Sequence, residues 1–139
     1  MTPRDPDWRT AALAGFERQG LLRSFGAEVL DMAPGRVVIA APITEATSQQ
    51  HGYGHAGLSF ALGDSAGGFA AQTLLEPGKG VLTIEMKINL LNPAQGERLI
   101  ATGQVEKPGR RISVVRADVE NEAGRAVATL LGTMMIVDG

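Results

Sequence analysis

The sequence predicts an α+β fold, in which one long apolar helix packs against an antiparallel sheet that can wrap around it. The residues from Ala56 to Leu75 are apolar or small on nearly every helical face, which is typical of a buried helix. Strand-like segments precede and follow this run, and the later ones are joined by links short enough for antiparallel neighbours. The 139 residues match the usual size of one domain, so we expect a single domain over residues 1–139.

The N-terminal part carries capping and turn signals. Asp5-Pro6 has the residue types of an N-cap and a first helical position, and apolar residues then recur at near-helical spacing. This pattern predicts a helical segment within residues 1–22. Next along the chain we expect a strand, a Pro-Gly turn, a second strand and a polar loop, at residues 25–32, 34–35, 36–43 and 44–54.

The long helix that follows is predicted from Ala56 to about Leu75, with Pro77-Gly78 ending it. Gly67 and Gly68 in its interior each cost about 1 kcal/mol relative to Ala. We expect the close approach of a neighbouring backbone or of a ligand to compensate, and we favour packing between the helix and the sheet.

The C-terminal half predicts four more strands. From Val81 to Leu91 apolar and polar residues alternate with a period of two, and Asn92-Pro93 stops this strand. The remaining strands are joined by turns at Pro108-Gly109 and Ala123-Gly124. We expect them over residues 97–106, 111–121 and 125–137.

Composition and charge exclude several classes of function. Hydrophobic residues make up 44% of the chain and charged residues 20%, which supports a packed core. Lys and Arg number 13 against 15 Asp and Glu, so there is no basic surplus to bind nucleic acid. The absence of cysteine excludes disulfides, thiolate metal sites and a cysteine nucleophile. No membrane-spanning or secretory segment is recognisable, so we expect a cytoplasmic protein.

The densest chemistry lies between Gln49 and Asp64. Glycines punctuate the entry into the long helix, and the first amides of a helix lie unpaired at its positive end. The amides of Ala56 and Gly57 are therefore candidates to hold a developing oxyanion. Asp64 is the only charged residue between His55 and Leu75, and a lone carboxylate on a buried helix is costly unless it is paired or used.

The spacing of these groups predicts more than one chain per site. Ala56 and Asp64 are eight residues apart, which is about 12 Å along a helix. One substrate carbonyl cannot contact both groups of the same helix. If both serve one reaction, the second group must come from another copy of the chain, so we expect a homodimer with shared sites, while a dimer of dimers stays open.

This stretch resembles the hotdog-fold thioesterases of the PaaI-like family, over about residues 25–137. The resemblance rests on His55-Ala56-Gly57, on Asp64 further along the helix, and on the strand that ends in Asn92-Pro93. It implies a sheet wrapped around the central helix and hydrolysis of an acyl-CoA thioester without a cofactor, since coenzyme A is part of the substrate. It also implies that Asp64 activates water or attacks the thioester, and that the Ala56 amide binds the carbonyl oxygen.

The resemblance implies further roles residue by residue. Ala56 replaces a glycine of the family pattern, which keeps the N–H and adds a methyl group. Gln49 stands where relatives often have Asn, as an amide that orients the carbonyl or the acid, and His55 shapes the helix entry or takes part directly. Thr83 matches a hydroxyl that orients water in some members, although strict alternation would place it on one face with Glu85 and Lys87.

Two charged features have competing interpretations. His51 and His55 have the spacing of a zinc pair, but the glycines between them disfavour a helix and no third ligand is near, so we expect no metal. Three basic residues flank the turn at Pro108-Gly109, and they form either a solvated hairpin or a site for the phosphates of coenzyme A. They are Lys107, Arg110 and Arg111.

Two alternative functions stay open at this point. A hotdog dehydratase or hydratase acting on acyl thioesters would pair a histidine base with an acidic residue, and His55 and Asp64 are both present. A non-catalytic acyl-CoA-binding module on the same fold is the other alternative. The acyl group of the substrate is not predictable from the sequence.

Overall fold

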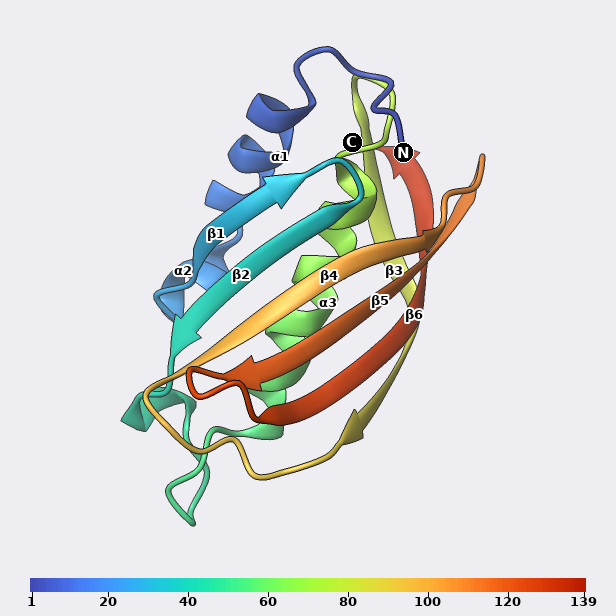
Figure 1. Ribbon diagram of the computed structural model, residues 1–139. Coiled ribbons are helices and arrows are strands. Elements are labelled where there is room, and N and C mark those ends of the chain that lie inside the picture. The colour runs from blue at the N-terminus through green and yellow to red at the C-terminus, as the bar shows by residue number, and fades with distance from the viewer.

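The computed structural model describes all residues, 1–139. Its main elements are one long helix and a six-stranded sheet, preceded by two short helices (Figure 1). The helices are α1 (Trp8–Glu17), α2 (Gly20–Ser24) and α3 (Ala56–Gln72), with a 3-10 turn η1 (Glu45–Thr47). The strands are β1 (Glu28–Ala33), β2 (Arg36–Pro42), β3 (Lys79–Leu90), β4 (Arg98–Lys107), β5 (Ile112–Asn121) and β6 (Ala126–Asp138).

The sheet is antiparallel throughout, in the order β1-β2-β4-β5-β6-β3, and it curves around α3 (Figure 1). The predicted α+β fold is therefore confirmed. β1 and β3 are the two edges, so β3 leaves one side without a strand partner along the 12 residues of its length. No helix has the length and apolarity of a membrane-spanning segment.

Helix α3 packs so closely on the sheet that glycine is required at the contact. A Cβ on Gly103 of β4 would lie 2.1 Å from the backbone carbon of Ala66, and one on Gly67 would lie 2.9 Å from Val115 of β5. The expected packing explanation is confirmed for Gly67. Gly68 differs, because the atoms nearest to its added Cβ would be at 3.7 Å and 3.8 Å and this position faces a pocket.

The helices and caps of the N-terminal segment differ from the sequence prediction. The predicted helical segment over residues 1–22 is split into α1 and α2, and the N-cap is Asp7. The Asp5 carboxylate instead accepts a hydrogen bond from the Asp7 N–H in the preceding turn, at 2.8 Å. Because α2 ends in Phe25 as its C-cap, the first strand starts at Glu28 and not at residue 25.

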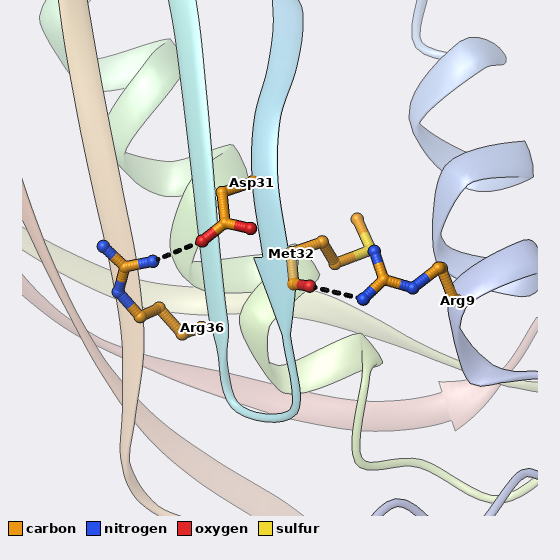
Figure 2. A network of polar contacts seen from close by, with 4 residues as sticks. All are labelled: Arg9, Asp31, Met32 and Arg36. Atoms are coloured by element: carbon orange, nitrogen blue, oxygen red, sulfur yellow. Dashed lines mark hydrogen bonds and ion pairs between the residues drawn. The ribbon is translucent and has the colours of Figure 1, made fainter.

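Polar contacts join α1 to β1, and β1 to β2, at the edge of the sheet (Figure 2). The Arg9 guanidinium donates to the main-chain carbonyl of Met32 at 2.8 Å, and Arg36 of β2 donates to the Asp31 carboxylate of β1 at 2.9 Å. Phe16 of α1 also packs edge-on against Phe69 of α3, with ring centroids 5.8 Å apart. These contacts hold the N-terminal segment against α3, where it forms a wall of the pocket described below.

Strand β3 does not keep the strict alternation that the sequence predicts. A bulge shifts its pairing with β6 between Thr83 and Glu85. Before the bulge Val81 and Thr83 face α3, and after it Met86 and Ile88 pack on the core. Leu82 and Ile84 face outward and are 58% and 53% exposed. The bulge therefore reverses which residues of β3 face the helix.

Candidate active site

Asp64 lies in the middle of α3, and its carboxylate is held by Thr83 from β3. The Thr83 hydroxyl donates to Asp64 Oδ1 at 2.6 Å and also lies 3.2 Å from the Met134 sulfur of β6. The expectation that Thr83 shares a face with Glu85 and Lys87 was wrong, because the bulge lies between Thr83 and Glu85. The structure brings together two residues that the sequence places 19 positions apart.

The Asp64 carboxylate opens into a pocket of about 400 Å³, which we call the Asp64 pocket. One side of α3 forms its floor, the start of β3 and Met134 form one wall, and Gln19 and Leu21 at the start of α2 form the other. Asp64 is half-buried at its edge. A carboxylate that is fixed by one hydrogen bond and still open to a pocket can accept a proton from a bound water or attack a bound carbonyl.

At the start of α3, His55 is the N-cap residue and its side chain caps the helix. Its Nδ1 accepts the Gly57 N–H at 2.7 Å. This bond requires an Nδ1 that carries no proton, and it occupies the Gly57 N–H. The Gly57 amide is therefore not free to act as the oxyanion donor that the sequence suggested. The Ala56 N–H, the first of the helix, has no acceptor within the chain and stays available.

A second pocket, of about 550 Å³, opens in front of Ala56, and we call it the Ala56 pocket. It is lined by the loop before α3 and by the end of β3 with Asn92-Pro93. Gln49 lines it, but its side-chain oxygen accepts the N–H groups of His51 and Tyr53 and so stabilises its own loop. Only the amide nitrogen of Gln49 remains uncommitted. The buried hydroxyl of Ser59 has no hydrogen-bond partner.

The Asp64 pocket and the Ala56 pocket have no lining residue in common. One lies at the start of β3 and the other at its end, in agreement with the separation of about 12 Å along α3. The groups that the sequence assigned to one reaction are thus divided within a single chain. Asp64 and Thr83 form one half, and His55, Ala56 and Gln49 form the other.

The basic residues lie near a third, polar pocket, at the end of α3 that is far from Ala56. Arg110 and Arg111 line it together with Arg4 and Lys79, whereas Lys107 does not. Lys79 pairs with Asp138, and this hydrogen bond raises the pKa of Lys79 above its ordinary value of 10.5. Arg4 lies 3.6 Å from Glu76. Arg110 and Arg111 form no ion pair and are the free cations of this pocket.

Sequence reasoning missed several pocket residues. Ser59 was predicted only as part of a buried helix, yet a polar residue three positions after Ala56 shares its helix face, which was an available signal. Gln72 had the same signal, eight positions after Asp64. Leu21 and Met134 carried none, because their approach to Asp64 depends on tertiary packing. No group of three or more His, Asp or Glu side chains is arranged to hold a metal.

Comparisons with known proteins agree with this architecture. The model of the thioesterase superfamily matches residues 51–128. The crystal structure of a thioesterase family protein from Silicibacter pomeroyi superposes with a TM-score of 0.91 at 40% identity, covering 95% of this chain and 99% of that chain. The acyl-coenzyme A thioesterase PaaI of Escherichia coli is 26% identical, with 95% of this chain and 92% of that protein covered. The 1,4-dihydroxy-2-naphthoyl-CoA hydrolase of Listeria monocytogenes is 28% identical, over 74% and 84% of the two chains.

The chain belongs to the thioesterase superfamily, with its hotdog fold, and it is a thioester hydrolase. The E. coli PaaI structure, at 23% identity and a TM-score of 0.88, supports the same fold. The resemblance drawn from His55-Ala56-Gly57 and Asp64 is thereby confirmed at the level of family and fold.

Proposed function

We propose that this protein hydrolyses an acyl-CoA thioester to a carboxylic acid and free coenzyme A. The observation that carries the proposal is the Asp64 carboxylate, held at 2.6 Å by Thr83 and open to a pocket. The names of the E. coli and Listeria relatives support an acyl-CoA substrate. A thioester is already activated, so a carboxylate and an oxyanion donor are sufficient for its hydrolysis and no further cofactor is needed.

The chemistry can follow two routes, which differ in the role of Asp64. As a general base, Asp64 takes a proton from water while the water oxygen attacks the thioester carbonyl carbon. As a nucleophile, it attacks that carbon itself, and water then hydrolyses the resulting anhydride. In both routes the carbonyl oxygen becomes an oxyanion, which the Ala56 N–H stabilises, and the C–S bond breaks to release the thiolate of coenzyme A. Thr83 orients the carboxylate, and His55 keeps the helix entry in shape.

We further propose that the active protein is a homodimer with shared sites. The free edge of β3 supports this arrangement, because two copies can pair antiparallel through it. Antiparallel pairing places the start of one β3, with Thr83, beside the end of the partner's β3 and the Asn92-Pro93 segment that follows it. The Asp64 pocket of one protomer then meets the Ala56 pocket of the other, and each dimer contains two complete sites.

A dimer of dimers is supported by a second surface. The outward face of β3, β5 and β6 carries exposed apolar side chains. They are Leu82, Ile84, Ile112, Leu131 and Met135, between 38% and 58% exposed. The register places Met135 beside Leu82 and Ile112, whereas Leu131 lies four residues earlier in β6, beside Lys87 and Arg116. An apolar patch of this kind is typical of an interface between proteins, so we propose that two dimers associate through it.

We also propose that Arg110 and Arg111 bind the phosphates of coenzyme A. Their guanidinium groups are unpaired and line a polar pocket of about 620 Å³, and Arg is suited to phosphate recognition. In the proposed dimer, this end of one protomer lies beside the partner's Ala56 pocket. Lys107 does not line this pocket.

The shared site is tested by complementation between two inactive variants. Asp64→Asn removes the carboxylate and should lower kcat at least about 100-fold. Ala56→Pro replaces the N–H by a ring carbon, at a first helical position that tolerates proline because the preceding His55 is extended. With random pairing half of the co-refolded dimers are mixed and each has one intact site, so about a quarter of the wild-type activity should return.

The controls separate the competing interpretations. Ala56→Gly keeps the N–H and should stay active, whereas equal activity of the proline and glycine variants would remove Ala56 from the mechanism. A mixture that stays inactive, although mass measurement shows mixed dimers, would contradict the shared site. Thiol release is followed alongside enoyl absorbance, because a hydratase would change only the second signal and a passive binding module neither.

A further inference from the structure

The Thr83 hydroxyl has two hydrogen-bond acceptors within reach but only one proton to donate. Its oxygen lies 2.6 Å from Asp64 Oδ1 and 3.2 Å from the Met134 sulfur. The first contact is a charge-assisted hydrogen bond, and the second is a hydrogen bond to a thioether sulfur, which is a weaker acceptor. In the proposed hydrolysis only the bond to Asp64 has a role so far.

The sheet and the central helix hold the Met134 sulfur in this place. Met134 of β6 lies directly opposite Thr83 of β3 in the register of the two strands, and it is 1% exposed. Its methyl group lies 3.7 Å from the position of a Cβ on Gly68, in the wall of the Asp64 pocket. Because Met134 is buried between the strand and α3, we expect its sulfur to stay within reach of the hydroxyl when a substrate fills the pocket.

A second acceptor matters because Asp64 loses its negative charge during the reaction. As a base it gains a proton, and as a nucleophile it becomes part of an anhydride. In both cases the charge-assisted bond from Thr83 weakens, and this loss opposes the step. A rotation of the hydroxyl about the Cβ–Oγ bond turns its proton from Asp64 to the sulfur. This rotation breaks no covalent bond and keeps Thr83 hydrogen-bonded.

We propose that Met134 is a positioning residue for this reaction, whose sulfur accepts the Thr83 hydrogen bond while Asp64 is uncharged. The inference rests on the proposed hydrolysis at Asp64 and adds a residue on which its rate depends. Met134 acts through Thr83 and not on the substrate. A leucine at this position has a similar volume and offers no acceptor, so it separates the sulfur from its packing.

The experiment is a double-mutant cycle between Met134→Leu and Thr83→Val, with thiol release from a saturating acyl-CoA as the assay. In the wild-type background Met134→Leu should lower kcat by about 2- to 5-fold. This is the lower part of the range for one neutral hydrogen bond, since sulfur is a weak acceptor. In the Thr83→Val background no hydroxyl remains to turn, so Met134→Leu should leave kcat unchanged.

Two controls separate the sulfur from general effects of packing. Met32→Leu makes the same exchange at a core methionine that is 3% exposed and lines neither pocket, so it should keep the wild-type kcat. The urea unfolding midpoint of each variant measures the change in stability.

The pH dependence of kcat/KM gives a second readout, which a packing defect alone would not move. Asp64 is the only ionisable residue that lines its pocket, and in the proposed dimer the partner's His51, Tyr53 and His55 lie beside it. These groups are the same in every variant compared. Without the sulfur the protonated form of Asp64 is less stabilised, so the acid limb should lie at lower pH in Met134→Leu than in the wild-type protein.

The outcomes that contradict the inference differ from those that contradict the function. An equal loss of kcat from Met134→Leu in both backgrounds would overturn the inference, because Met134 would then act by packing alone. A Met134→Leu protein with wild-type kcat would overturn it as well. If the wild-type protein hydrolyses no acyl-CoA, the proposed function itself fails. The turning hydroxyl is then tested by the NMR titration of the Asp64 carboxyl carbon, which should move to lower pH in Met134→Leu; an unchanged titration would refute it.

Discussion

The hydrogen bond between Thr83 and Asp64 gives the sharpest test of how the site is held together. Thr83→Val replaces the hydroxyl by a methyl group of similar size and leaves the carboxylate without its donor. A hydrogen bond to a charged group contributes about 1.5–3 kcal/mol. Because Thr83 is an exposed position, we take the lower end of this range, which corresponds to about a tenfold loss in kcat. Thr83→Ser retains the donor and should keep most of the activity.

The assay is thiol release under saturating acyl-CoA, with the urea unfolding midpoint as a measure of folding. Thr133→Val is the matched control, because Thr133 pairs with Glu85 across β6 and β3 and contacts neither pocket. It should leave kcat unchanged. A folded Thr83→Val protein with wild-type kcat would show that the carboxylate needs no help from β3, and the positioning argument would be refuted.

Three further predictions concern stability. Gly103→Ala should destabilise the fold by about 3 kcal/mol or more, measured by urea unfolding, because its Cβ would meet the backbone of α3 at 2.1 Å. Gly68→Ala, whose Cβ would make only ordinary contacts at 3.7 Å and 3.8 Å, should instead stabilise the fold by up to about 1 kcal/mol. Similar effects for both would contradict the packing. His55→Ala should cost about 1 kcal/mol by removing the cap of Gly57, whereas His55→Asn should keep it. Backbone N–H groups, first that of Glu97, lower the pKa of Glu122 below 4.5, so its stabilisation is present above that pH and lost as the pH falls through the lowered value; Glu122→Gln should flatten this acid limb in unfolding curves taken across pH.

Much of the fold was predictable from the sequence because its largest feature is compositional. A helix of small and apolar residues with a single charge can only be buried, and the short Gly-containing turns of the C-terminal half allow only antiparallel neighbours. The same features located Asp64 and Ala56 without any contact information. The helix ends at Gln72 rather than at Leu75, and such boundaries depend on capping geometry that composition does not specify.

The errors have a different physical origin, because each depends on a contact between distant segments. The bulge in β3 is invisible in a sequence that alternates without a break, and only its pairing with β6 reveals it. That bulge turns Thr83 toward Asp64. By its position the Gly57 amide was a reasonable oxyanion donor. The backbone of His55 is extended, however, and this places the His55 Nδ1 2.7 Å from the Gly57 nitrogen. A capping side chain thus decides which amide remains available.

The division of the site between two chains follows from the properties of a single helix. An oxyanion donor benefits from the helix N-terminus, where amides are unpaired and the dipole is positive. A carboxylate that serves as base or nucleophile must lie away from that end of the helix, since several amide hydrogen bonds together with the dipole would stabilise its charge and weaken its basicity far more than the single, orienting bond from Thr83 does. Two turns of helix separate the two environments in this protein. Antiparallel pairing through β3 would bring the Asp64 carboxylate of one protomer to the Ala56 amide of its partner, and each group would keep the environment that it needs. For this reason we expect activity to depend on the dimer.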